Sequence, residues 1–287
     1  KRLAIGEQFV KVQERILATE HFLDGRWILG QGTIYPDTIE SGGTAKADLI
    51  KTHHNRVAGI QALIDAGRIL EPLTSFYKDE VREIGREIGI PTKFLSRHPF
   101  PGPGLAIRCL CSEKRASLTE TEDGFLLPLR SVGVQGDARS YRAVLALGQP
   151  PTAEDIQKTA PALTNNRRDI NRVVALCGRK APLGSLEVFE ASITKPRLDL
   201  LREADAIVRR FCEAGGFENR VWQFPVVLLP VGSGEALESI VLRPINSSDG
   251  MTADVVLMGA EQLEQLTLEL LALEGIAAVF YDLTHKP

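Results

Sequence analysis

Three prolines and two glycines fall within the eight residues from Arg97 to Gly104, which read Arg-His-Pro-Phe-Pro-Gly-Pro-Gly. Proline fixes φ and has no backbone N–H, so this segment can form neither a helix nor a central strand. Because it is too rigid for a flexible linker, it predicts an ordered bridge between two domains, which continues into a strand at 105–108. Its backbone amides could shape a pocket; the alternative is a purely structural corner.

Before the bridge, the apolar pattern alternates between strand and helix. Apolar residues at helical spacing predict a helix over about 4–19, and the run 27–30 predicts a short buried strand. Two further helices are expected, one over about 57–64 that Gly67 ends, and one over about 79–88 that Gly89 follows. Alternation of this kind is typical of an α/β layer.

After the bridge, the chain contains a weak internal repeat. Strand-like runs at 126–129 and 141–145 correspond to runs at 228–231 and 238–242. Each pair is followed by a helical region and a further strand, at 171–176 in the first copy and 276–281 in the second. Helices are expected from Pro196, with an apolar face, and around the leucine stripe at 263–273. Two such β-β-α-β units are each too small to bury a sheet face, so we expect them to pack on one another or on a partner subunit.

Composition excludes several classes of protein. The 287 residues contain 34 Lys and Arg against 37 Asp and Glu, a balance that argues against a dedicated nucleic-acid binder. No apolar run approaches the roughly 18 residues of a membrane span. Four cysteines form no disulfide scaffold and fit a reducing, cytoplasmic setting. The chain begins at Lys1 without a methionine and ends at Pro287, which suggests a piece of something longer.

Two carboxylates stand close together in the predicted loop 35–43. Asp37 and Glu40 are three residues apart after a strand, and two glycines follow them. Ligands bind at the mouth of a parallel sheet, where carboxylates can hold Mg²⁺ and glycines admit a phosphate. The alternative is an ordinary helix N-cap and turn.

A cation, two imidazoles and an amide occur together in the segment Lys51-Thr52-His53-His54-Asn55. Such side chains could neutralise a leaving pyrophosphate and donate hydrogen bonds to it. Adjacent histidines point apart on a helix or a strand, so His53 and His54 make a poor metal pair. A polar surface turn is the alternative.

Other candidates carry less information. A Gly-Asp turn at 136–137 predicts a hairpin, in which Asp137 and Arg139 could contact a ligand. Cys109 and Cys111 would face one side of a strand, but no second pair stands at zinc spacing. The sequence has neither the nucleophile elbow of serine hydrolases nor a basic and aromatic patch for nucleic acid.

A set of motifs in a consistent order runs along nearly the whole chain: GQGTIYPD (30–37), IKTHHN (50–55), KDEVR (78–82), RHPFPGPGLAIR (97–108), GVQGD (133–137), QFPV (223–226), SDGMT (248–252) and YDLTHKP (281–287). Together these motifs resemble the glutamine-hydrolysing GMP synthetases. The two copies of the repeat resemble the longer, eukaryotic-type enzymes.

The resemblance implies an α/β fold in three parts. Residues 1–107 would be the C-terminal part of an ATP-pyrophosphatase domain with an adenine-nucleotide α-hydrolase-like (PP-loop) parallel sheet. Residues 108–195 and 196–287 would be two β-β-α-β dimerisation subdomains that form a homodimer. The implied ligase uses Mg-ATP to adenylate XMP, and ammonia from glutamine, released by a separate amidotransferase domain, displaces AMP to give GMP. No nucleic acid or membrane partner is implied.

The resemblance also gives residues roles. Lys51, His53, His54 and Asn55 resemble the lid that closes over ATP and XMP, and Asp37 and Glu40 the acidic pair near Mg-pyrophosphate or the lid hinge. The positions that match XMP contacts are Arg2, Asp137, Arg139, Gln223 and Lys286.

One element of the family pattern, the pyrophosphate loop Ser-Gly-Gly-X-Asp-Ser, has no match in the chain. A second hypothesis is therefore a non-catalytic unit for dimerisation and XMP binding. A third is another PP-loop adenylating enzyme, such as an NAD synthetase or a tRNA-modifying enzyme, which should lack the HPFPGPGL turn.

Overall fold

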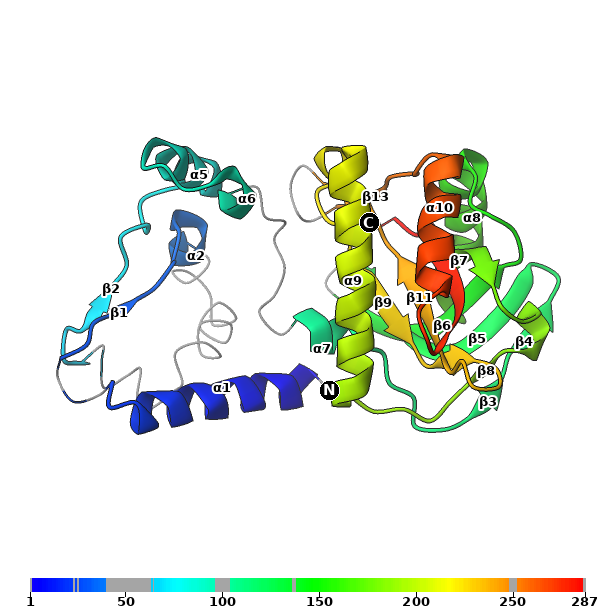
Figure 1. The fold of residues 1–287 in the computed structure, drawn as a ribbon, viewed down its shortest axis with the longest axis horizontal. Helices are drawn as coiled ribbons and strands as arrows, with labels where there is room; N and C mark the ends of the chain where they lie inside the picture. The colour runs from blue at the N-terminus through cyan, green and yellow to red at the C-terminus, as the bar shows by residue number, and fades with distance from the viewer. Residues whose placement is uncertain are drawn as a thin grey trace. The chain divides into compact units, whose positions relative to one another are not determined.

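The structure, a computed structural model, describes residues 2–22, 24, 26–39, 63, 65–95, 104–135, 138–247 and 252–285. It divides into two compact units, Lys1–Pro99 and Phe100–Pro287 (Figure 1). The division falls inside the Pro/Gly segment, while the three domain boundaries expected from the sequence remain a prediction. No helix in the described part of the chain is long and apolar enough to cross a membrane.

The first unit contains short α/β elements: α1 (Arg2–Thr19), β1 (Leu29–Gly30), α2 (Tyr35–Ile39), β2 (Ile69–Leu70), α5 (Lys78–Glu87) and α6 (Thr92–Leu95). β1 and β2 pair in parallel, with Leu29 opposite Ile69. The helices predicted over 4–19 and 79–88 are confirmed, whereas most of the helix predicted over 57–64 lies outside the described residues. Gly67 and Gly89 have φ angles of 67° and 79°, the left-handed conformation that glycine adopts after a helix.

The second unit opens with a helix where a strand was predicted. Residues Gly104–Arg108 form α7, so the strand expected over 105–108 is wrong. Leu-Ala-Ile-Arg contains good helix formers, and a run of three apolar residues has no period that separates helix from strand. Tertiary contacts favour the helix, because Leu105 packs on the core and Arg108 Nη1 bonds to Val226 O at 3.0 Å.

The rest of the second unit follows the predicted repeat. In chain order its elements are β3 (Ala116–Ser117), β4 (Thr119–Thr121), β5 (Gly124–Gln135), β6 (Ala138–Leu147), the π-helix η1 (Asp155–Thr159), α8 (Ala160–Asn166), β7 (Ile170–Arg179), the 3-10 helix η2 (Leu183–Ser185), β8 (Glu187–Val188), α9 (Lys195–Gly215), the 3-10 helix η3 (Phe217–Arg220), β9 (Val226–Leu229), β10 (Val231–Gly232), β11 (Glu238–Leu242), β12 (Ile245–Asn246), β13 (Asp254–Val255), α10 (Ala260–Leu271) and β14 (Ile276–Asp282). Counting only its longer strands, each half therefore contains two strands, a helical region and a third strand.

All the long strands belong to one seven-stranded sheet of order β4-β5-β6-β7-β14-β11-β9. β5 and β6 form the predicted hairpin, β6 and β7 are parallel, and the second half repeats this pattern as β9, β11 and β14. The third strands of the two halves, β7 and β14, pair antiparallel at the centre. The halves thus pack on one another, as expected, but whether they are separate subdomains remains a prediction.

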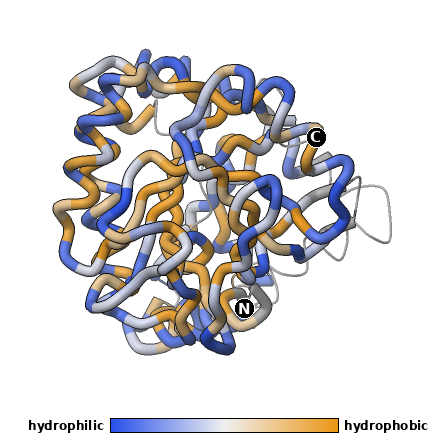
Figure 2. Tube along the Cα trace, turned by 90° about the vertical axis from the view of Figure 1, so that its right-hand side faces the viewer, coloured by the Kyte–Doolittle hydropathy of each residue, from blue (hydrophilic) through white to orange (hydrophobic). Residues whose placement is uncertain are grey.

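Two apolar clusters cover the two faces of this sheet. On one face, side chains of α8, α9 and α10 pack on the strands (Figure 1). On the other, β8 and β10, which pair in a small sheet with β3, cover a second cluster. Figure 2 shows the hydrophobic residues concentrated along the inner strands, with hydrophilic residues in the outer loops.

Candidate functional site

Three charged side chains meet at one end of the seven-stranded sheet. Asp282, the last residue of β14, is only 2% exposed, and its Oδ2 lies 2.8 Å from Arg172 Nη1 and 3.2 Å from Arg243 Nε. Its other oxygen, Oδ1, accepts a hydrogen bond of 2.9 Å from the backbone N–H of Thr284. We refer to Arg172, Arg243 and Asp282 as the ionic cluster.

The ionic cluster joins the two halves of the sheet. Arg172 lies near the start of β7 in the first half, and its Nη2 donates to Val132 O in β5 at 3.1 Å. Arg243 directly follows β11 in the second half. Burial, and then the neighbouring Arg172 guanidinium, lower the pKa of Arg243 to about 10. Two guanidinium groups thus share one carboxylate in the cluster.

Gln223 lies beside the segment that follows Arg243. Its backbone N–H donates to Ile245 O at 3.1 Å, and its carbonyl accepts from Ile245 N at 2.9 Å. The backbone N–H of Arg243 in turn donates to Pro225 O at 3.1 Å. These bonds fix the position of Gln223 along the sheet relative to the ionic cluster.

His285, three residues after Asp282, joins parts of both halves. Its Nδ1 lies 3.1 Å from Asp254 Oδ1 and accepts from Val255 N at 3.3 Å. Its Nε2 lies 3.1 Å from Ile156 O in the π-helix η1, which suits a tautomer protonated at Nε2. The imidazole therefore holds the end of β14 against the first half.

A buried amide supports the base of the β5–β6 hairpin. Asn171 Nδ2 donates to Ser131 O at 3.0 Å and Ser140 O at 3.1 Å, and its Oδ1 accepts from Ser140 Oγ at 3.0 Å. A Cβ at Gly133 would stand 2.6 Å from the Asn171 side chain, so only glycine fits there. This network lies in the part of the hairpin that leads to the predicted ligand residue Asp137.

In the first unit, Asp37 lies in α2, so the segment expected to be a loop is a helix at 35–39. Its Oδ2 accepts a hydrogen bond of 3.0 Å from the backbone N–H of Ile34, which precedes the helix. A carboxylate stabilises this end of a helix by satisfying a free N–H and by its charge. Asp37 is the third residue of α2, and its bond back to the residue before the helix is the one that an acidic side chain makes at this position of a capping box. Its Mg²⁺ role remains a prediction.

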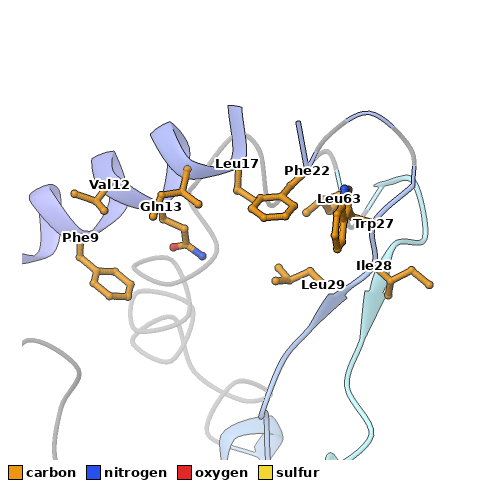
Figure 3. A pocket seen from close by; sticks show the side chains of 10 residues that line it. Phe9, Val12, Gln13, Leu17, Phe22, Trp27, Ile28, Leu29 and Leu63 are labelled. Carbon is orange, nitrogen blue, oxygen red and sulfur yellow. The ribbon is translucent and has the colours of Figure 1, made fainter. Parts of the chain in front are cut away.

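An apolar pocket of about 440 Å³ also lies in the first unit, between α1 and the segment that leads into β1 (Figure 3). Leu17 and Leu63 are buried there beside Phe22 and Leu29. Gln13 supplies the polar side chain of the lining, and none of the predicted site residues that the structure describes contributes to it.

The structure describes few of the predicted site residues. Those outside the described residues are Glu40, Lys51, His53, His54, Asn55, Asp137 and Lys286. Arg2 and Arg139 are described by their backbone alone, in α1 and β6. Asp37 and Gln223 belong to different units.

The cysteine prediction is wrong in one respect. Cys109 pairs with Leu228 in an isolated β-bridge and is buried, whereas Cys111 is exposed. The two cysteines therefore do not lie on a common strand. The cause is the helix α7, which replaces the strand that was expected to lead into them. No group of acidic, histidine or cysteine side chains suited to a metal ion occurs among the described residues.

Sequence analysis missed the residues of the ionic cluster. Asp282 stands in a quoted motif, but a charged residue at the end of a strand looks like an ordinary boundary. Arg172 offered a clearer signal, because it directly precedes the apolar run Val173–Leu176 in the strand predicted at 171–176.

Comparison with known proteins gives similar sequences along the whole chain. A family model described as the GMP synthase C terminal domain matches residues 211–287, which include Gln223, Arg243 and Asp282. A probable glutamine-hydrolysing GMP synthase of Leptospira interrogans is 43% identical over 306 residues, covering 100% of this chain and 50% of that protein. The chain matches the C-terminal part of the glutamine-hydrolysing GMP synthases. The resemblance drawn from the motifs is thereby confirmed.

Eukaryotic GMP synthases match along the whole chain as well. A probable GMP synthase of Caenorhabditis elegans is 31% identical, covering 100% of this chain and 51% of that protein. The GMP synthase of Dictyostelium discoideum is also 31% identical, covering 100% and 49%. The chain thus spans about half the length of the curated relatives that it matches.

Proposed function

We propose that this chain is the XMP-aminating part of a glutamine-hydrolysing GMP synthase. The observation that carries the proposal is the similarity to GMP synthases over the whole chain, 43% in the Leptospira protein. In the proposed reaction, the C2 oxygen of XMP attacks the α-phosphate of ATP and pyrophosphate leaves. Ammonia from a glutamine amidotransferase domain then displaces AMP to give GMP.

The site must hold two nucleotides and stabilise a departing pyrophosphate. We assign the phosphates of ATP to Lys51, with His53, His54 and Asn55 in the same lid. Asp37 and Glu40 are assigned to Mg²⁺ or to the lid hinge. An ammonium group is a point charge that suits a phosphate oxygen.

XMP is assigned to residues of the second unit and to Arg2. The assigned contacts of the second unit are Asp137, Arg139, Gln223 and Lys286. The position of Gln223 supports this assignment, because its backbone pairs with Ile245 near the cationic end of the sheet. A net positive charge at this end of the sheet favours the binding of a nucleoside monophosphate such as XMP, which is an anion.

The finer organisation belongs to the same proposal. It comprises a PP-loop sheet that includes 1–107, two β-β-α-β subdomains at 108–195 and 196–287, and a homodimer formed through them. The parallel pairing of β1 with β2 supports the first part, and the matching strand order of the two halves supports the second.

The test of the activity is the conversion of XMP to GMP by the intact protein, with ATP and ammonia supplied. We expect GMP, AMP and pyrophosphate in equal amounts. The absence of GMP under conditions in which a known GMP synthase is active would contradict the proposal, and XMP binding without turnover would favour the non-catalytic module instead.

The role of Lys51 is tested by Lys51→Ala. Removing a charge that stabilises the leaving pyrophosphate should slow adenylation about 100-fold or more, while the Kd for XMP stays nearly unchanged. Pyrophosphate release and XMP calorimetry measure the two effects, with Lys180→Ala, an exposed lysine on the loop after β7, as the control. An unchanged rate of pyrophosphate release would contradict this role.

A further inference from the structure

The two halves of the seven-stranded sheet are related by an approximate twofold axis. At the central pair of strands, Ala175 of β7 lies opposite Tyr281 of β14. On either side of this pair, Val174 lies opposite Asp282 and Leu176 opposite Phe280. A twofold axis at Ala175 and Tyr281 would exchange these two pairs.

The outer strands obey the same relation. Leu147 of β6 lies beside Ala175, and Leu242 of β11 lies beside Tyr281. Likewise Val144 lies beside Arg172, and Ser239 lies beside Ala278. The paired residues of β6 and β7 therefore have counterparts in β11 and β14.

The ionic cluster has no counterpart. The equivalents of Arg172, Asp282 and Arg243 are Ala278, Leu176 and Gly148, so all three charges are absent at the other end of the sheet. Ala278 and Leu176 belong instead to the apolar cluster on that face. The three charged positions of one half thus correspond to apolar residues or glycine in the other half.

This difference indicates that the ionic cluster serves a ligand. Buried charges carry a desolvation cost, and well-packed apolar residues of similar volume often stabilise a fold at least as well. The same chain uses apolar residues at the equivalent place, so the cluster is not a packing requirement of this sheet. Its surplus of positive charge suits an anionic ligand.

The cluster also contacts the three segments that lead to the assigned XMP residues. Asp282 Oδ1 holds the N–H of Thr284, two residues before Lys286. Arg172 Nη2 holds Val132 O, in the strand that leads to Asp137. The third segment, with Gln223, is held by the bond from Arg243 N to Pro225 O and by the backbone bonds between Gln223 and Ile245.

We propose that Asp282 is a positioning residue for XMP. By binding Arg172 of the first half and Arg243 of the second half, it aligns the three segments that carry the XMP contacts. The repeated sheet then has one XMP site per chain, because the equivalent end has lost the cluster. This inference rests on the proposed XMP-aminating function.

The test is calorimetry on the intact protein with Asp282→Asn, which keeps the shape of the side chain and removes its charge. Loss of alignment should raise the Kd for XMP about 10-fold to 100-fold and leave the Kd for ATP nearly unchanged. The unsubstituted protein should bind one XMP per chain.

Glu238→Gln is the matched control. Glu238 forms a similarly buried ion pair with Arg197, with side-chain exposures of 12% and 11%, at the other end of β11. Its loss should lower the melting temperature as much as Asp282→Asn does, without changing the Kd for XMP. If Asp282 contributes to stability alone, Asp282→Asn and Glu238→Gln should have the same Kd for XMP.

Arg172→Gln tests whether Asp282 acts through its partners. If it does, the double variant with Asp282→Asn should lose less XMP affinity than the product of the two single losses. Arg172→Lys, which keeps the charge, should lose less XMP affinity than Arg172→Gln. If Asp282→Asn does not fold, the comparison of these two Arg172 variants is the test.

The outcomes separate this inference from the proposed function. Absence of XMP binding by the unsubstituted protein would overturn the proposed function and this inference with it. A second outcome would overturn the inference alone. In it, the Kd for XMP of Asp282→Asn and of the Arg172 variants would equal that of Glu238→Gln. Two XMP molecules per chain would also overturn it.

Discussion

Tyr281 is a fully buried tyrosine at the centre of the sheet, and its hydroxyl has two backbone partners. It donates to Val256 O at 2.5 Å and accepts from Met258 N at 3.0 Å. Burial raises the pKa of Tyr281 well above its usual range, so the hydroxyl remains protonated and able to donate. The hydroxyl thus anchors the segment between β13 and α10 on the strand β14.

Tyr281→Phe should therefore destabilise the protein by about 1–3 kcal/mol, because it leaves a backbone donor and an acceptor unpaired. Urea unfolding measures the change, with an unaltered m value. Tyr141→Phe is the control, since Tyr141 is 54% exposed and its substitution should change stability by less than about 0.5 kcal/mol. Equal effects of the two substitutions would contradict the role of the Tyr281 hydroxyl.

The four cysteines differ sharply in environment. Cys109 and Cys212 are buried, Cys177 is half-buried, and Cys111 is exposed. Burial raises the pKa of Cys177 and of Cys212 to about 12. The thiolate is the reactive form of cysteine. At pH 8, only about one molecule in ten thousand would carry a thiolate at either of these two positions.

A thiol reagent such as DTNB should therefore modify one cysteine rapidly in the native protein at pH 8. Cys111→Ser should remove that rapid phase, and denaturant should expose the remaining thiols. The absorbance of the released thiolate gives the count, and two or more rapid equivalents before denaturation would show that a second cysteine is accessible.

At the scale of the elements, α9 shows how local signals define a helix. Pro196 stands in its first turn, and the buried residues Leu201, Ala204 and Val208 follow helical spacing. The helix ends at Gly216, whose φ of 65° lies in the left-handed region and whose N–H caps the last turn.

Gly216→Ala should cost about 1 kcal/mol, because alanine in the left-handed conformation is strained whatever the space around it. Gly148→Ala is the control, since Gly148 is exposed, has no left-handed φ and has open space around its Cα. Thermal unfolding should show a loss for Gly216→Ala alone. A similar loss at both positions would mean that the strain at Gly216 is not the cause.

The same scale shows where sequence reasoning succeeds. The helices α1, α5, α9 and α10 were predicted because each has an apolar period that does not depend on the rest of the fold. The strand prediction for residues 105–108 is wrong because three apolar residues carry no period, and the contact of Leu105 with the core favours the helix α7. The succession of two strands, a helical region and a third strand was predicted in each half, and a hairpin was predicted in the first half, because these signals are local.

Long-range pairing is what the sequence could not supply. The register of β7 on β14 joins residues about 100 positions apart, and no local pattern specifies it. The ionic cluster depends on that register, because it places Asp282 opposite Val174, within reach of Arg172. The site residues that were predicted came from motifs, which carry family resemblance but no geometry.

At the scale of the whole molecule, the second unit has two halves but a single continuous core. β7 and β14 form an unbroken link between the halves, and each apolar cluster contains side chains of both. Phe280, fully buried, lies opposite Leu176 at this seam. We therefore expect the two halves to unfold as one cooperative unit.

Phe280→Ala tests this expectation. Removing a buried phenyl ring costs about 3–5 kcal/mol, and a shared core transmits the loss to every strand of the sheet. Native-state hydrogen exchange should then show the same loss of opening free energy for amides of β5 and β6 as for those of β9 and β11. Leu268→Ala, at an exposed position of α10, should leave both sets unchanged. If only the second half lost protection, the halves would be independent folding units, and the ionic cluster would have to align its ligand segments across a seam that opens on its own.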